Sequence, residues 1–245
     1  MMNYKIISKT IIGTRKQQQD KMYHSKSNQL AFAVICDGMG EISSDEVPSE
    51  AAVNTIIDLY NSKPKSQSYP QFYYNSIEKL DESVIEFQKR TGCLMAGTTF
   101  SSVCIEKDKL FWLSIGDTRI YIIRENEIVQ ITNDHNVKWL IENFDCSDNE
   151  ELTNTSRPDA LVSFLGLDGI EHFDLNTTPF TLQNNDKIFI TSDGITKVLD
   201  DQSIYQILTG SSFENSLNNL FEIATQFSFG SQDNTTCILI SIENS

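Results

Sequence analysis

Four aspartates in this chain lie beside short apolar stretches. Asp37 comes directly after the apolar residues 31–36, and Asp117 and Asp193 closely follow two further apolar stretches. Asp233 stands just before the last apolar stretch of the chain. An ionised carboxylate that is buried costs several kcal/mol unless it is paired or bound to a metal. Because an aspartate also suits an ordinary turn at a strand end, only the set of four argues for a site.

These aspartates reach one edge of the protein if the apolar stretches are strands. If residues 235–242 run antiparallel to residues 187–191, the end of one strand lies beside the start of the other. Asp193 and Asp233 then meet. Three carboxylates at strand ends and one at a strand start converge in this way. Asp20, in the loop before the strand of residues 30–36, is placed to join them.

Such a group of carboxylates predicts a site for hard divalent cations. Several carboxylates cannot converge in the ionised form without a cation. Oxygen ligands with no histidine nearby favour Mg²⁺ or Mn²⁺ over zinc. Two such ions, about 4 Å apart, activate a water between them and hold a phosphoryl group. Arg15 is the candidate for a bidentate contact with that phosphate.

The elements that must position these residues are both β and α. Short runs rich in β-branched residues predict strands at residues 4–13, 30–36, 98–105, 110–115, 119–123, 128–132, 187–191 and 235–242. Apolar residues at helical spacing predict helices from Pro48 to about 60, along 73–87, at 203–208 and around 217–224. The four runs between 98 and 132 indicate an antiparallel meander. No repeat or shift in composition divides the chain, which predicts a single domain over residues 1–245.

Composition narrows the partners and the compartment. The formal charge is −15, so nucleic acid and anionic membrane surfaces are not expected as partners. No apolar run approaches the roughly 18 residues of a membrane span. The five cysteines include no Cys-x-x-Cys pair, and the first residues lack a signal-peptide pattern, so a cytoplasmic protein is expected. No cysteine has an arginine six residues later, which excludes a cysteine-based phosphatase.

The order of motifs resembles the metal-dependent protein phosphatases of the protein phosphatase 2C type, in their short bacterial form. The matching pieces span nearly the whole chain: residues 15–20 (RKQQQD), 37–40 (DGMG), 96–99 (AGTT), 116–119 (GDTR), 132–135 (TNDH), 191–194 (TSDG) and 232–235 (QDNT). The resemblance implies an α+β fold, a four-layer α-β-β-α sandwich with two central antiparallel sheets flanked by helices. It also implies Mn²⁺ or Mg²⁺ as cofactor, two ions with a third as an option.

The resemblance assigns roles to individual residues. Asp37 would bridge the two ions, with the Gly38 carbonyl on one of them and Asp193 and Asp233 completing a shell. Asp20 would bind or orient metal-bound water, and Arg15 would hold the phosphate. The catalytic set is thus Arg15, Asp20 and Asp37, and the metal set is Asp20, Asp37, Gly38, Asp117, Asp193 and Asp233, in which Asp117 and Asp193 match a third-metal site.

Glu41 and the segment before Gly166 depart from the family pattern, whereas Met39 is the residue of its bacterial members. Glu41 follows Gly40 where the family usually has a second glycine, and it is placed to add a carboxylate near the metals. Met39 leaves no histidine there as general acid, so protonation of the leaving group falls to water. The expected flap over the site, residues 137–165, lacks the Thr-Arg often found before Gly166. Within it, residues 145–160 are polar and predict a mobile surface segment.

The predicted function is hydrolysis of phosphoserine and phosphothreonine in proteins by attack of a metal-bridging hydroxide. Two alternatives stay open: a non-catalytic module of the same fold that binds phosphoproteins, and a two-metal phosphoesterase for small phosphates. The expected partners are phosphorylated proteins and, by family analogy, a cognate serine/threonine kinase. A monomer is expected.

Overall fold

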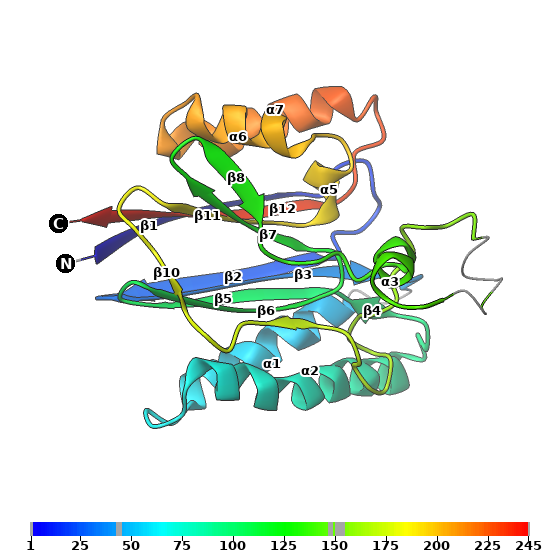
Figure 1. Cartoon of the computed structure of the whole chain (residues 1–245). Helices are drawn as coiled ribbons and strands as arrows, with labels where there is room; N and C mark the ends of the chain where they lie inside the picture. Colours follow the sequence, from blue (N-terminus) through cyan, green and yellow to red (C-terminus); the bar gives the residue numbers. More distant parts are fainter. Residues whose placement is uncertain (1, 43–45, 147–148, 150–154, 245) are drawn as a thin grey trace.

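The computed structural model of the chain describes residues 2–42, 46–146, 149 and 155–244. Two antiparallel sheets pack face to face, and helices cover the outer face of each (Figure 1). The layers are therefore helix, sheet, sheet and helix, which confirms the predicted sandwich. No helix formed by these residues has both the length and the apolar character needed to cross a membrane.

The first sheet contains the start and the end of the chain. Its order is β1 (Met2–Ile11), β12 (Thr235–Asn244), β11 (Lys187–Thr191), β7 (Arg119–Arg124) and β8 (Glu127–Gln130), and every neighbouring pair is antiparallel. Thr191, the last residue of β11, pairs with Cys237 near the start of β12. The predicted meeting of these two strand ends is therefore confirmed.

The second sheet holds the apolar strand that precedes Asp37. Its main order is β10 (Phe180–Thr181), β6 (Lys109–Ile115), β5 (Phe100–Glu106), β3 (Leu30–Met39) and β2 (Asp20–Ser27), with β4 (Gly97–Thr98) on β3 and β9 (Asp174–Leu175) on β6. The sequence did not predict β2, β9 or β10. β2 is a polar edge strand paired only with β3 in this sheet, so it carries little apolar signal.

The position of Asp20 differs from the expectation. It was expected in a loop, but it is the first residue of β2, where it pairs across the sheet with Asp37. Cross-strand partners lie about 5 Å apart, so the pairing places these two acids side by side. The polar stretch before Asp20 is loop, as predicted.

Two helices cover the second sheet and two cover the first (Figure 1). The long pair is α1 (Pro48–Ser62) and α2 (Tyr69–Thr91), and the other pair is α6 (Asp201–Thr209) and α7 (Phe213–Phe227). The short α3 (Val137–Asn143) lies beyond one end of the sheets, and the four-residue α5 (Asp193–Thr196) was not predicted. α2 starts at a Ser68 cap and ends at Gly92, whose φ of 75° suits glycine.

The three packed interfaces explain why the central strands read as unbroken apolar runs. Along β3, Phe32, Val34 and Cys36 face the helices α1 and α2, whereas Ala33 and Ile35 face the other sheet. Side chains alternate between the two faces of a strand, and both faces are buried in a four-layer protein. β11 and β12 follow the same rule, with Ile190 and Ile240 between the sheets and Phe189 under α6 and α7.

The predicted flap, residues 137–165, is tied down at its C-terminal end. At its C-terminal end, the Val162 amide donates to the carbonyl of His135 and the Leu165 amide donates to the carbonyl of Thr98 (both 2.9 Å). At its start, the Val137 amide donates to the carbonyl of Ala160 (2.9 Å), which joins the two arms of the flap to each other. Part of the predicted mobile segment, residues 147–148 and 150–154, lies outside the described residues.

Asp81 anchors the chain directly after the flap. This carboxylate on α2 is 5% exposed and accepts hydrogen bonds from the amides of Gly166 (2.6 Å) and Gly169 (2.8 Å). Gly166 has a φ of +107°, and a Cβ there would lie 2.9 Å from Val84. A buried carboxylate with two amide donors thus fixes a turn that only glycine fits closely against α2.

Asp81→Ala is expected to lower the free energy of unfolding by about 3 kcal/mol, because the amides of Gly166 and Gly169 both lose a charged acceptor. Urea denaturation measures the change. Glu86→Ala, at an exposed position of the same helix, is the matched control and should change stability by less than about 0.5 kcal/mol. A loss below about 1 kcal/mol for Asp81→Ala would contradict the anchoring role.

Candidate active site

The ends of β11 and β12 bring two aspartates to one ammonium group. Asp193 opens α5 directly after β11, and Asp233 stands two residues before β12. The Nζ of Lys197 contacts Asp193 Oδ2 and lies 3.5 Å from Asp233 Oδ2. The antiparallel pairing thus places both carboxylates at the same end of the sheet.

Asp20 and Asp37 reach the same place from the other sheet. Asp20 is 3% exposed, and its Oδ2 accepts a hydrogen bond from the Ser192 hydroxyl (2.8 Å). Ser192 precedes Asp193, so this bond joins β2 to the turn after β11. The second oxygen of Asp20, Oδ1, is buried and has no hydrogen-bond partner.

Two threonines hold the backbone around Asp37 and Asp117. The Asp37 amide donates to Thr99 Oγ1 (2.9 Å), and the Thr99 amide donates to the Asp37 carbonyl (2.9 Å). The Thr99 hydroxyl also bonds the Thr118 hydroxyl (2.7 Å) beside Asp117. Gly116 completes this turn with a φ of +98°, and a Cβ there would lie 2.7 Å from Thr99. A hydrogen-bond chain therefore links the backbone of Asp37 to Thr118, the residue after Asp117.

The acids act on one another electrostatically. Burial raises the pKa of Asp37 well above its usual value, and the charges of Asp20, Asp193 and Asp117 raise it further. Burial and Asp193 raise the pKa of Asp117 to about 7. The pKa of Asp20 rises to about 6, mainly through burial. Without cations, these groups cannot all ionise at neutral pH at low cost.

Arg15 binds the acid cluster directly. Its Nε lies 2.7 Å from Asp233 Oδ1 and a terminal nitrogen lies 2.7 Å from Asp233 Oδ2, a bidentate pair. Burial raises the pKa of Asp233, but Arg15 and Lys197 outweigh burial and the net shift is downward. Arg15 is 61% exposed at its side chain and borders the cleft, so its guanidinium is accessible.

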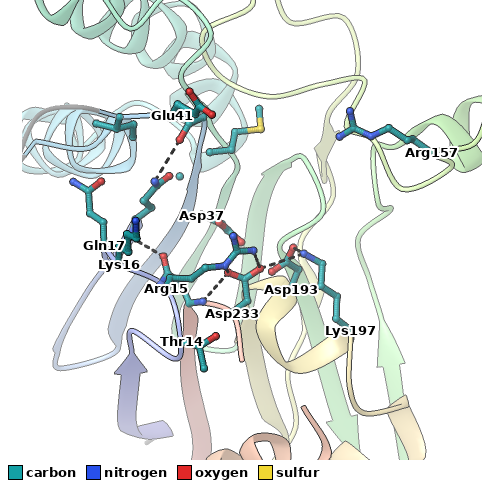
Figure 2. A pocket seen from close by; sticks show the side chains of 16 residues that line it. Thr14, Arg15, Lys16, Gln17, Asp37, Glu41, Arg157, Asp193, Lys197 and Asp233 are labelled. Atoms are coloured by element: carbon teal, nitrogen blue, oxygen red, sulfur yellow. Dashed lines mark hydrogen bonds and ion pairs between the residues drawn. The ribbon is translucent and has the colours of Figure 1, made fainter. Parts of the chain in front are cut away.

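A cleft of about 790 Å³ opens over these residues (Figure 2). Its lining includes most of the predicted site together with several residues that were not predicted: Thr14, Arg15, Lys16, Gln17, Gln19, Asp37, Gly38, Met39, Gly40, Glu41, Ile42, Arg157, Asp193, Lys197, Asp233 and Asn234. Asp20 and Asp117 are absent from the lining. Glu41 and Arg157 lie on different sides of the cleft, away from Arg15 and Asp233 (Figure 2).

The acid cluster contains the donors of a divalent-metal site, with two basic side chains among them. Among the described residues, no three His, Cys, Asp or Glu side chains stand together as ligands of one ion. Arg15 and Lys197 neutralise Asp193 and Asp233 instead. The donors nevertheless fit hard cations, because they are carboxylates that share a polar cleft. Asp20 Oδ1 and Asp193 Oδ1 are moreover buried without any partner, which suits oxygens that accept a ligand.

The sequence predicted no role for Lys197 and Arg157, two basic residues of the cleft. Lys197 follows Asp193 by four residues, a spacing that brings side chains together on a helix. The spacing indicates a contact only if residues 193–197 are predicted to be helical, and the sequence predicted no helix there. Arg157 lies within the predicted flap, but in a polar segment without periodicity, so no pattern distinguished it from its neighbours as a cleft residue.

Comparisons with known proteins agree with this fold. A family profile described as protein phosphatase 2C matches residues 10–232. The serine/threonine phosphatase stp of Listeria welshimeri is 25% identical over 224 residues, which are 89% of this chain and 87% of that protein. The chain therefore belongs to the protein phosphatase 2C family.

Solved structures share the fold. The crystal structure of the Mycobacterium tuberculosis serine/threonine phosphatase PstP/Ppp superimposes with a TM-score of 0.80 at 21% identity, over 98% of this chain and 99% of that chain. A structure of the PstP catalytic domain in complex with two manganese ions superimposes with a TM-score of 0.79 at 20% identity, over 100% of both chains.

The buried acids predict a pH effect on stability in the protein stripped of divalent ions with EDTA. The folded-state pKa of Asp20, about 6, lies above its unfolded value. Its contribution to stability is therefore complete below about pH 4 and is lost as pH rises through 6. We expect Asp20→Asn to be more stable than the wild type at pH 8 by about 2 kcal/mol and to show a smaller change in stability with pH.

Urea denaturation at pH 5 and pH 8 measures both quantities. Asp58→Asn, at an exposed position of α1, is the control and should follow the wild type. If the EDTA-treated wild type were as stable at pH 8 as at pH 5, the electrostatic interpretation of Asp20 would be wrong.

Proposed function

We propose that this chain is a metal-dependent protein serine/threonine phosphatase that hydrolyses phosphoserine and phosphothreonine. The observation that carries the proposal is the convergence of carboxylates from both sheets, together with Arg15, at one cleft of the family fold. The named relatives support it, because stp and PstP are serine/threonine phosphatases and the PstP structure contains two manganese ions.

In this proposal, the carboxylates that line or adjoin the cleft hold the ions. Asp37 and the carbonyl of Gly38 bind from β3, and Asp193 and Asp233 bind from the first sheet. If a third ion binds, Asp117 would hold it together with Asp193. Bound Mn²⁺ or Mg²⁺ would supply an activated water and would neutralise charge on the phosphoryl oxygens.

Other groups of the chain bind and orient. The Arg15 guanidinium presents two N–H groups at the cleft, and the same fork that binds Asp233 fits two phosphate oxygens. Asp20 is oriented by the Ser192 hydroxyl, which leaves Oδ1 as an acceptor for a water proton. Met39 lines the cleft and has no titratable group, so the leaving oxygen takes its proton from water.

We also propose the wider setting of the enzyme. Residues 1–245 form one catalytic domain with residues 137–165 as a flap, and the protein acts as a cytoplasmic monomer on phosphorylated proteins, opposite a serine/threonine kinase. The net charge of −15 argues against nucleic acid as a partner.

Hydrolysis of a phosphothreonine peptide in the presence of Mn²⁺ tests the activity. We expect turnover by the wild type, its loss with EDTA, and a fall in kcat of at least about 100-fold for Asp193→Ala, which removes a metal-holding carboxylate. The matched control Asp58→Asn should retain wild-type turnover.

Three outcomes of this assay contradict the proposal. The absence of turnover by the wild type, with phosphopeptide binding retained, indicates the regulatory module. Turnover restricted to small aryl phosphates indicates a phosphoesterase for small substrates. Full activity of Asp193→Ala overturns the site.

Arg15→Ala should raise KM for the phosphopeptide at least about tenfold with a smaller effect on kcat, because Arg15 contacts the phosphate in substrate and transition state alike. Arg15→Lys keeps the charge but loses the bidentate fork, so its KM should lie between the two. Steady-state kinetics separate the parameters. An unchanged KM in Arg15→Ala would show that Arg15 only neutralises Asp233.

A further inference from the structure

Lys197 places a positive charge inside the acid cluster. Its ammonium group contacts Asp193 Oδ2 and lies 3.5 Å from Asp233 Oδ2. The positive charge also acts on Asp117 and Asp37. Figure 2 shows the side chain pointing toward the two aspartates at the cleft. Lys197 thus lies among the carboxylates that were assigned to cations.

The two oxygens of Asp193 have different surroundings. Oδ2 is engaged by Lys197, whereas Oδ1 is buried and has no hydrogen-bond partner. One oxygen therefore remains for a divalent ion while the other already carries a positive charge. A further divalent ion on the Lys197 side of Asp193 would have to approach that ammonium, and like charges a few ångströms apart repel strongly in a half-buried site.

The charges of the cluster balance without a third ion. Asp20, Asp37, Asp117, Asp193 and Asp233 carry five negative charges when all are ionised. Two divalent ions and one ammonium group compensate them, which leaves Arg15 for the phosphate. A third divalent ion in addition to Lys197 would leave the site with excess positive charge before substrate binds.

We propose that Lys197 takes the place of a third divalent ion beside Asp117 and Asp193, so that this chain binds two ions and excludes the third. This inference rests on the proposed function in so far as the cleft binds divalent ions at all. Lys197 acts as a counter-ion that, unlike a bound metal ion, cannot dissociate. Its ammonium group is carried by a flexible, half-exposed side chain.

Direct Mn²⁺ binding tests the proposal without an activity assay. Calorimetric titration, with free Mn²⁺ followed by electron paramagnetic resonance, should find two ions per wild-type chain. In Lys197→Gln a third ion should bind. Its Kd should be at least about tenfold lower than the Kd of any weak third Mn²⁺ site of the wild type. The double variant Lys197→Gln/Asp117→Asn should return to two ions, which would locate the third ion at Asp117.

Two lysine variants serve as controls. Lys197→Arg keeps the positive charge and should bind two ions. Lys5→Gln removes a lysine of similar exposure that is ion-paired with Glu243 on the first sheet, and it should also bind two ions. If Lys197→Gln does not fold, the single variant Asp117→Asn tests the inference. It should still bind two Mn²⁺ ions, because no third ion depends on Asp117.

Several results would overturn the inference. Three ions on the wild type, or the same count and affinities in wild type and Lys197→Gln, exclude the counter-ion role and leave the phosphatase proposal standing. Loss of an ion in Asp117→Asn alone has the same meaning. If no variant binds Mn²⁺, both the inference and the metal-dependent function fail.

Discussion

The repulsion among carboxylates gathered at one end of the two sheets governs the structure of this site. Asp20 and Asp37 are neighbours across a pair of strands, and Asp193 arrives from the opposite sheet. Burial alone makes these groups hard to ionise, and their mutual charge makes it harder. A protein that nevertheless brings them together needs positive charge in the same place. Arg15 and Lys197 supply part of it, and the remaining demand is what a divalent ion satisfies.

A rigid scaffold is needed to hold such a cluster, and the four-layer sandwich provides it. Asp37, Asp193 and Asp233 stand at or near the ends of β3, β11 and β12, strands whose two faces are both buried. The connections between sheets are specific: Ser192 bonds Asp20, and Thr99 bonds both the backbone of Asp37 and the Thr118 hydroxyl. None of these bonds involves the flap, whose C-terminal end is fixed separately through His135 and Thr98.

The basic residues at the cleft divide between two tasks. Arg15 has a planar fork at the opening and can exchange Asp233 for a phosphate, since both present two oxygens. Lys197 is a point charge held against Asp193 and Asp233. Family resemblance alone assigns the acids, whereas the number of ions that they hold depends on which cations the chain already contributes. The geometry of one lysine thus bears on the metal content of the whole site.

Sequence alone determined the strands that form the core, the chemistry of the acids and the family, because apolar runs and motif order are local properties. It also predicted that β11 and β12 meet, which follows from antiparallel pairing. Only the tertiary structure decided that Asp20 begins a strand opposite Asp37, since β2 is a polar edge strand with no apolar pattern. The places of Lys197 and Arg157 at the cleft were likewise decided by packing. Contacts between residues that lie far apart in the chain depend on how the two sheets stack, which no local pattern encodes.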